Sequence, residues 1–104
     1  MGNYRRKLDI IADILDVASG NAKKTQIMYQ ANLSYAVLQK YLAEMTSVAL
    51  ISFDNEKHCY VLSDKGRAFL NGYQEYSKTN RHLEKRLNAV RTKKSVLEKL
   101  CSIK

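Results

Sequence analysis

The last forty residues carry a heptad pattern that a domain of this size cannot bury with its own surface. Apolar or core-compatible residues recur at alternating intervals of four and three: Phe69, Tyr73, Tyr76, Asn80, Leu83, Leu87, Val90, Lys94, Leu97 and Cys101. This spacing predicts one helix from about Ser63 to Cys101, roughly 58 Å long at about 1.5 Å per residue. Its seam needs a partner, and we predict a second copy of the same chain.

The seam residues also indicate how the two copies are oriented. A parallel pair would bury Lys94 against its own counterpart and bring like charges together. An antiparallel pair instead places Lys94 beside Tyr76 and packs Leu83 on Leu87 near the two-fold axis. We therefore predict an antiparallel coiled-coil homodimer. The alternative is that the helix doubles back on its own domain or is partly frayed.

The residues before this helix show the order of elements of a winged helix-turn-helix domain. Apolar residues at helical spacing predict helices at about 7–19, 25–31 and 34–48, with a break at 32–34. Two strands at 50–53 and 58–62 flank a polar turn and form a wing. We predict a mostly α fold of the α+β winged-helix class. The domain spans 1–68, and a dimerisation helix at 69–104 continues its last helix.

Residues at the expected helix ends fit this assignment. Gly20 is expected to supply the left-handed turn that closes the first helix. Ser34 and Ser63 stand where the N-caps of the third helix and of the long helix are expected. Leu8 is expected on the buried face of the first helix, and Leu33 is expected to fill the turn before the third.

The positive charge is concentrated in the C-terminal part of the chain. Of the net charge of +8, residues 1–62 contribute +1 (seven basic, six acidic) and residues 63–104 contribute +7 (eleven basic, four acidic). An excess of this size predicts a polyanionic partner, usually nucleic acid. The alternative is a solvated helical face.

Several other classes of protein are not indicated. No apolar run reaches the roughly 18 residues of a membrane span, and we expect a cytoplasmic, nucleoid-associated protein. Cys59 and Cys101 lack the spacing of a disulfide framework or a zinc site. No phosphate-binding loop, nucleophile elbow or HExxH motif is present. We predict no enzymatic activity, metal, cofactor or small-molecule ligand.

Two passages resemble a known family. Residues 24–35, KTQIMYQANLSY, with Leu38, Lys40, Tyr41 and Leu42, resemble the helix-turn-helix core of archaeal winged-helix DNA-binding proteins. Residues 62–66, LSDKG, resemble the passage that follows the wing in such domains. The short chain with one long C-terminal helix is similar to the crenarchaeal ten-kilodalton "Sso ten-a" type. That resemblance implies a winged helix, DNA binding and an antiparallel coiled-coil dimer.

The candidate DNA contacts are expected on the exposed side of the helix-turn-helix, at the chain start and in the wing. They are Ser34, Tyr35, Gln39 and Lys40 at the third helix, Lys23, Lys24 and Thr25 at the second, Arg5 and Arg6, and Lys57 in the wing. Gln39 is expected to pair with adenine, and Lys40 with guanine or phosphate. Alternatively, Tyr35 is a lid over the second helix, and Gln39 and Lys40 are solvated surface.

The function predicted from these features is double-stranded DNA binding as a homodimer. The protein is either a chromatin-like architectural protein or a transcriptional regulator that reads an operator sequence. The alternative is a protein-interaction adaptor that holds its partner through the coiled coil, because winged-helix folds also serve that role.

Overall fold

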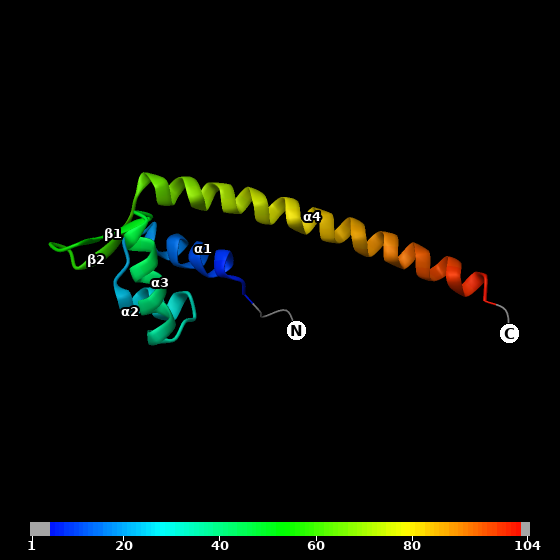
Figure 1. Ribbon diagram of the computed structural model, residues 1–104, viewed down its shortest axis with the longest axis horizontal. Coiled ribbons are helices and arrows are strands. Elements are labelled where there is room, and N and C mark those ends of the chain that lie inside the picture. Colours follow the sequence, from blue (N-terminus) through cyan, green and yellow to red (C-terminus); the bar gives the residue numbers. More distant parts are fainter. Residues whose placement is uncertain (1–4, 103–104) are drawn as a thin grey trace. The chain divides into compact units, whose positions relative to one another are not determined.

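The computed structural model describes residues 5–102; residues 1–4 and 103–104, the outer ends of the two predicted domains, lie outside this range. The elements in chain order are α1 (Lys7–Ala18), α2 (Lys24–Gln30), α3 (Tyr35–Ser47), β1 (Ile51–Asp54), β2 (Cys59–Leu62) and α4 (Asp64–Leu100) (Figure 1). This order confirms the mostly α winged-helix class with a long C-terminal helix. The chain divides into two compact units, one ending at Tyr73 and the other beginning at Gln74.

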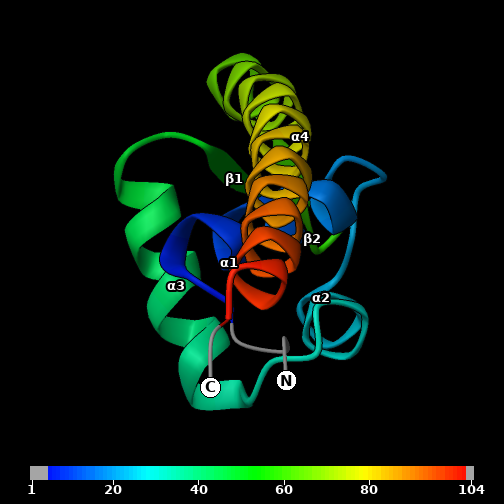
Figure 2. The same cartoon turned by 90° about the vertical axis from the view of Figure 1, so that its right-hand side faces the viewer.

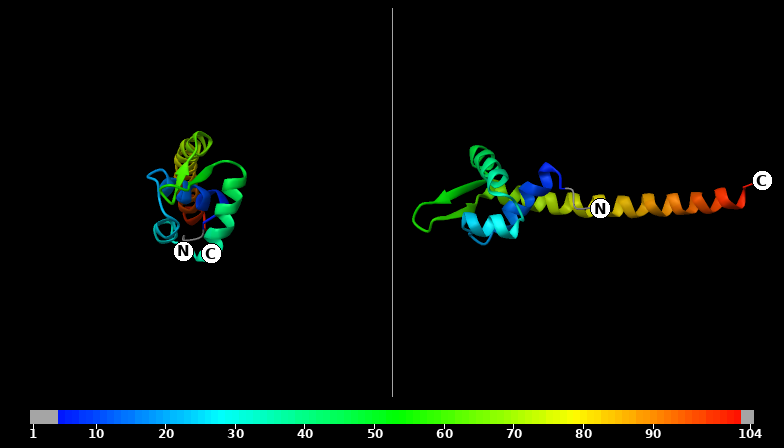
Figure 3. Two further views of the ribbon diagram at one scale, coloured as in Figure 1. Left: turned by 90° about the vertical axis from the view of Figure 1, so that its left-hand side faces the viewer. Right: turned by 90° about the horizontal axis from the view of Figure 1, so that it is seen from below.

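The core of the first unit is built from the apolar faces of all its helices and the start of the hairpin. In end-on views α2 and α3 flank α1 (Figure 2 and the left view of Figure 3). Its largest fully buried side chains are Ile14, Leu15, Ile27, Leu38, Met45 and Ile51. Each contributes about 1.5–3 kcal/mol relative to exposure. The expectation for Leu8 is wrong: it lies in the first turn of α1 and is 47% exposed, and the buried face begins at Ile11.

A capping side chain begins α3, and a residue in the left-handed conformation follows the end of α1. The N-cap prediction for Ser34 is confirmed, because its Oγ accepts a hydrogen bond from the Val37 N–H at 3.3 Å. The expectation for Gly20 is wrong, since Asn21 has the positive φ of 60° and no described glycine does. Gly20 still follows the helical path, donating its N–H to the Val17 carbonyl, so the left-handed residue comes one position later. Asparagine is among the residues that tolerate this conformation best.

The hairpin has the predicted antiparallel form, but β1 lies one residue later than predicted and β2 begins one residue later. Ile51 pairs with Leu62, and Asp54 pairs with Cys59. The Asp54 carboxylate accepts hydrogen bonds from two backbone N–H groups of the turn, at 2.9 and 3.2 Å. The hairpin protrudes beyond α2 and α3 (Figure 1 and the right view of Figure 3), as a wing does.

An additional bridge joins β2 to the segment between α1 and α2. Tyr60 donates its N–H to the Ala22 carbonyl at 2.7 Å and accepts the Ala22 N–H at 3.3 Å. The sequence did not predict this pairing, because a one-residue bridge has no periodicity of its own. It fixes the wing against the start of the helix-turn-helix.

The LSDKG passage locks the start of α4 onto the connection between α3 and β1. The Ser63 N-cap is confirmed, since its Oγ accepts the Gly66 N–H at 2.9 Å and also lies 2.9 Å from the Leu50 carbonyl. Lys65 donates to the Val48 carbonyl at the end of α3, at 2.7 Å. A Cβ at Gly66 would lie 2.2 Å from the Leu50 carbonyl oxygen, so only glycine allows this approach.

The first turns of α4 belong to the core of the first unit. Leu70 is buried, and Phe69 and Tyr73 are partly buried against the same core. The Tyr73 hydroxyl donates a hydrogen bond to the Asp9 carboxylate on α1. Both Phe69 and Tyr73 were predicted as the first residues of the dimer seam, and the structure gives them a place inside their own domain.

Candidate nucleic-acid interface

The helix-turn-helix consists of the seven-residue α2, a tight turn and α3. The turn is closed by Asn32, whose φ is 55°, and by a hydrogen bond of 3.0 Å from the Leu33 N–H to the Met28 carbonyl. Leu33 packs partly buried against the core, as predicted. The chain then enters α3 with Ser34 as its cap, so the first turn of α3 lies at the protein surface.

The exposed face of α3 carries the residues predicted to face outward. Leu38 and Leu42 are buried, whereas Tyr35 is 60% exposed and Gln39, Lys40 and Ala43 are exposed. This division follows from helical periodicity: residues four positions apart share a face. The structure therefore presents a stripe of mixed aromatic, amide and ammonium groups.

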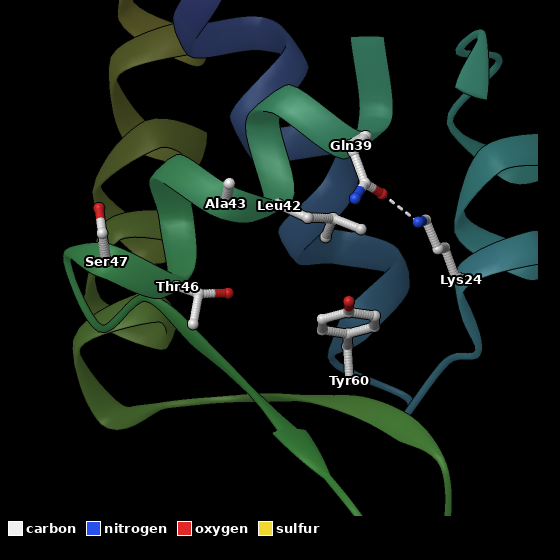
Figure 4. Close-up of a pocket in the computed structure, with 7 residues that line it drawn as sticks. All are labelled: Lys24, Gln39, Leu42, Ala43, Thr46, Ser47 and Tyr60. Carbon is white, nitrogen blue, oxygen red and sulfur yellow. Dashed lines mark hydrogen bonds between the residues drawn. The ribbon is translucent and has the colours of Figure 1, made fainter. Parts of the chain in front are cut away.

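Lys24 of α2 connects two of these α3 side chains. Its ammonium nitrogen lies 3.1 Å from the Tyr35 hydroxyl oxygen and 4.2 Å from the centroid of the Tyr35 ring. It also donates a hydrogen bond to the Gln39 Oε1 (Figure 4). Tyr35 therefore contacts α2, as expected of a lid, while most of its surface is exposed, and its contact with DNA stays a prediction.

The contact with Lys24 defines what Gln39 offers to a ligand. An ammonium group can only donate, so the amide oxygen of Gln39 must face Lys24. The amide NH₂ remains, with two donors. The two-bond pairing with adenine that we predicted also needs this oxygen, because adenine presents both an acceptor and a donor. Pairing with adenine would therefore require this oxygen to accept from Lys24 and from the base through its two lone pairs, whereas a base acceptor needs only the NH₂.

A hollow of about 410 Å³ lies beside this cluster, between α2, α3 and β2 (Figure 4). Its lining consists of Lys24, Gln39, Leu42, Ala43, Thr46, Ser47 and Tyr60. The sequence analysis missed Thr46, Ser47 and Tyr60. The first two continue the exposed stripe of Gln39 and Ala43 at helical spacing, a signal that was available, whereas Tyr60 reaches the hollow only through folding of the wing.

The other predicted phosphate contacts, which are cations except for Thr25, lie at separate places on the first unit. Lys23 is the exposed residue just before α2, and Thr25 is exposed in its first turn. Lys57 is exposed in the turn of the wing. Arg6 is exposed at the start of α1, where its backbone N–H donates to the Asp9 carboxylate at 2.9 Å.

Arg5 differs from these cations because its guanidinium is bound within the domain. It donates to the Asp13 carboxylate at 2.8 Å, to the Ala31 carbonyl at 2.6 Å and to the Asn32 carbonyl at 2.8 Å. These contacts tie α1 to the end of α2 and to the turn. Arg5 is therefore placed to position the helix-turn-helix rather than to reach a phosphate.

Two further contacts of α1 hold it to other helices of the first unit. Lys7 forms an ion pair of 3.2 Å with Glu44 on α3. The Tyr73 hydroxyl, and then the Arg6 backbone N–H, lower the pKa of the Asp9 carboxyl by hydrogen bonding to its charged form. This carboxylate accordingly links the start of α1 to α4.

In the second unit the remaining predicted seam residues are exposed. Tyr76, Leu83, Leu87, Val90 and Leu97 have exposed fractions of 54%, 54%, 43%, 62% and 66%. Asn80 and Lys94 are exposed on the same helix, and Cys101 is exposed just after its end. Leu83, Leu87, Val90 and Leu97 thus form an exposed apolar row on this helix.

Within residues 5–102 no three His, Cys, Asp or Glu side chains are grouped so as to hold a metal ion. Cys59 is buried and Cys101 is exposed, both as free thiols. None of the described helices combines the length and apolar character that crossing a membrane requires.

Comparison with known proteins identifies the fold family. The winged helix-turn-helix family model matches residues 4–81. Among solved structures, the DNA-binding protein Sso10a-2 from Sulfolobus solfataricus is 26% identical, with a TM-score of 0.78 over 85% of this chain and 95% of that chain. Wild-type ZitR from Lactococcus lactis in complex with DNA is 14% identical, with a TM-score of 0.53 over 98% and 81%, and shares the fold.

A second ZitR structure, of a mutant, is likewise 14% identical, with a TM-score of 0.59 over 97% of this chain and 75% of that chain. A comparison with curated proteins finds no match. The structural similarity to Sso10a-2 confirms the resemblance to the Sso ten-a type that the sequence indicates. With more than half of its length matched by the family model, the chain belongs to the winged helix-turn-helix family.

Proposed function

We propose that this protein binds double-stranded DNA as a homodimer, through the winged helix of each copy. The exposed stripe of α3, with Lys24, Tyr35 and Gln39 joined in one polar cluster, carries the proposal. Winged-helix proteins of this arrangement place the second helix of the motif in the major groove. The DNA-binding protein Sso10a-2 and the DNA-bound ZitR have the same fold, which supports this ligand.

In this proposal α3 enters the major groove by its N-terminal end. Ser34 and Tyr35 lie at that end, and Gln39 and Lys40 follow one turn later. The NH₂ of Gln39 donates to a base acceptor, such as guanine N7 or O6 or thymine O4. Lys40 reaches guanine or a phosphate. Tyr35 packs on sugar or methyl groups while its ring holds the Lys24 ammonium.

Phosphate contacts come from the cations around this helix and from the Thr25 hydroxyl. Lys23, Lys24 and Thr25 at the start of α2 flank one side, and Arg6 and Lys57 lie at the start of α1 and in the wing. Residues 5–73 nevertheless carry a net charge of only +2, from nine basic and seven acidic residues. The winged-helix unit of one copy therefore has little excess charge for phosphate binding, and we expect tight binding to depend on two copies.

The partner that covers the exposed seam of α4 is a second copy of the chain. We place the dimer interface at Tyr76, Asn80, Leu83, Leu87, Val90, Lys94, Leu97 and Cys101, with Leu83 packed on Leu87 of the other copy. Large apolar side chains at such spacing are stable in water only when covered. The antiparallel orientation follows from Lys94, which then lies beside Tyr76. The winged-helix domain extends to Tyr73, since Phe69 and Tyr73 pack on its core.

The protein acts as an architectural protein or as a transcriptional regulator at the nucleoid. Titrating the full chain with random duplexes, and with duplexes selected from a random library, at several salt concentrations distinguishes the two. A regulator prefers its selected site by roughly a thousandfold or more, whereas an architectural protein shows little preference. Lack of retention on any duplex at low salt would contradict the proposal and favour a protein-interaction adaptor.

A further inference from the structure

The side of α4 that faces away from the proposed dimer seam carries positive charge without acidic residues from Lys78 to Lys99. The proposed DNA contacts of the winged helix do not include this side. With the seam residues at heptad positions a and d, positions b, c and f face outward. Between Lys78 and Lys99 these outward positions hold Lys78, Arg81, His82, Lys85, Asn88, Ala89, Thr92, Ser95, Val96 and Lys99. They include four Lys or Arg and no acidic residue.

The acidic residues of this segment lie elsewhere on the helix. Glu84 and Glu98 occupy position e, beside the seam, where Arg91 also lies. Glu75 is the only outward acid, one turn before Lys78. Because oppositely charged side chains alternate beside the seam but not on the outer side, the outer side is not the balanced face of an ordinary solvated helix.

Three basic residues and one histidine on this side line one hollow. Lys78, Arg81, His82 and Lys85 line a depression of about 150 Å³. We call these four residues the outer basic face. All four are exposed, and they belong wholly to the second compact unit, which begins at Gln74. They are spaced three, one and three residues apart, so they share one side of the helix over two turns.

We propose that the outer basic face is a second DNA-binding surface that contacts the phosphate backbone of duplex DNA, separately from α3. It presents lysine and arginine donors with one imidazole and no Phe, Tyr or Trp side chain, so it suits phosphates rather than base edges. From Lys78 to Lys85 the helix rises about 10 Å, and over that distance one DNA strand presents about three phosphates. Each copy therefore matches about three phosphates with Lys78, Arg81 and Lys85.

The surface remains available whatever the orientation of the dimer, because outward heptad positions face solvent in parallel and antiparallel pairs alike. It adds the charge that the winged-helix unit lacks. Residues 74–102 carry a net charge of +5, from eight basic and three acidic residues, against +2 for residues 5–73. The inference rests on the proposed function, because it takes duplex DNA as the ligand.

The test compares two full-length variants that lose the same charge from the same helix. In the first, Lys78, Arg81 and Lys85 are changed to Gln; in the control, Arg86, Arg91 and Lys93, which flank the seam, are changed to Gln. Glutamine has a helix propensity close to those of Lys and Arg, so the helix content should be retained. Circular dichroism and solution mass confirm that each variant is folded and has the oligomeric state of the wild type.

The measurement is the dependence of the DNA association constant on salt, using one random-sequence duplex. Loss of three phosphate contacts in one copy lowers the slope of log K against log salt by about 2.7, and loss in both copies by about 5. We expect this loss, with at least a tenfold drop in affinity at low salt, for the first variant. The control variant should show a clearly smaller decrease in the salt slope and in the affinity for DNA.

Equal losses of salt slope and of DNA affinity in the two variants would overturn the inference. The positive charge of α4 would then attract DNA irrespective of its position on the helix. Wild-type affinity in the first variant would also overturn it while leaving the proposed function intact. Failure of the wild type itself to bind duplex DNA would overturn both proposals. Retention of the wild type on phosphatidylserine vesicles, lost only in the first variant with DNA binding unchanged, would assign the surface to a membrane instead.

Discussion

Two glycines in α4, six residues apart, show that this one helix is held in two different ways. At Gly66 a Cβ would collide with the Leu50 carbonyl oxygen at 2.2 Å, whereas at Gly72 nothing lies within 4 Å of such a Cβ. The turns around Gly66 are fixed by the core, the Ser63 cap and the Lys65 contact. Beyond Tyr73 the side chains of α4 are mostly exposed, and the second copy that we propose would stabilise this part of the helix.

The largest expected effect concerns the part of α4 beyond Tyr73. Changing Leu83 and Leu87 together to Asp should abolish dimerisation, because four carboxylates would meet at the centre of the proposed seam. Solution mass should fall to that of the monomer, and DNA affinity should fall with it. Thermal unfolding of the first unit should persist, since neither residue lies in its core. Wild-type affinity in a monomeric double mutant would contradict the role of the dimer.

Replacement of a buried leucine tests the core of the first unit. Leu38→Ala removes a fully buried side chain of α3, and we expect a loss of about 2–5 kcal/mol in the free energy of unfolding. The matched change Leu97→Ala removes a side chain that is 66% exposed within one chain. Its effect should appear only as a concentration-dependent loss of dimer. Urea unfolding at two protein concentrations separates the two effects.

Replacement of Gly66 and of Gly72 by alanine should change stability in opposite directions. Gly66→Ala should destabilise the first unit by about 1–3 kcal/mol, because the backbone at Leu50 or at α4 must move. Gly72→Ala should stabilise α4 by up to about 1 kcal/mol, since alanine is the better helix former and meets no neighbour. Thermal melting of both variants at one concentration measures the difference. Similar destabilisation by both would show that Gly72 also has a close neighbour.

The Lys24 contact predicts a change in base preference. Lys24→Met frees the Gln39 amide oxygen, so binding should shift toward adenine at the base pair that Gln39 contacts, by about 1–3 kcal/mol if two bonds form. Lys23→Met, at the neighbouring exposed lysine, should weaken binding to all sequences alike. A series of duplexes with single base-pair changes measures both. An unchanged preference in the Lys24 variant would mean that Gln39 does not read a base.

The smallest effect concerns acid stability. The Tyr73 hydroxyl is the main cause of the lowered Asp9 pKa, so the contact stabilises the folded chain above the unfolded pKa of about 4. That stabilisation is lost as the pH falls through the lower folded pKa. Tyr73→Phe should therefore be less stable than the wild type near pH 6, with the difference shrinking below pH 4. Tyr29→Phe, at an exposed tyrosine, serves as the control for chemical denaturation across this range.

Much of the candidate site could be predicted from local sequence patterns. Ser34 as a cap and the exposed stripe with Tyr35, Gln39 and Lys40 follow from the spacing of Leu38, Leu42 and Met45 along one helix. The roles of Arg5 and Lys24 could not be predicted. Each side chain is long and was expected to reach a phosphate, but its partners come from other helices, at positions that only the packing of α1, α2 and α3 brings near.

The sequence by itself determined the order of the elements, the two capping serines and the single period of the long helix, because these depend on residues within a few positions of one another. The tertiary structure decided where that helix changes from core element to exposed rod. The heptad period runs unbroken through Phe69 and Tyr73, and a period cannot tell which surface an apolar row will meet. The answer lies in distant contacts, from Asp9 to Tyr73 and from Leu50 to Gly66.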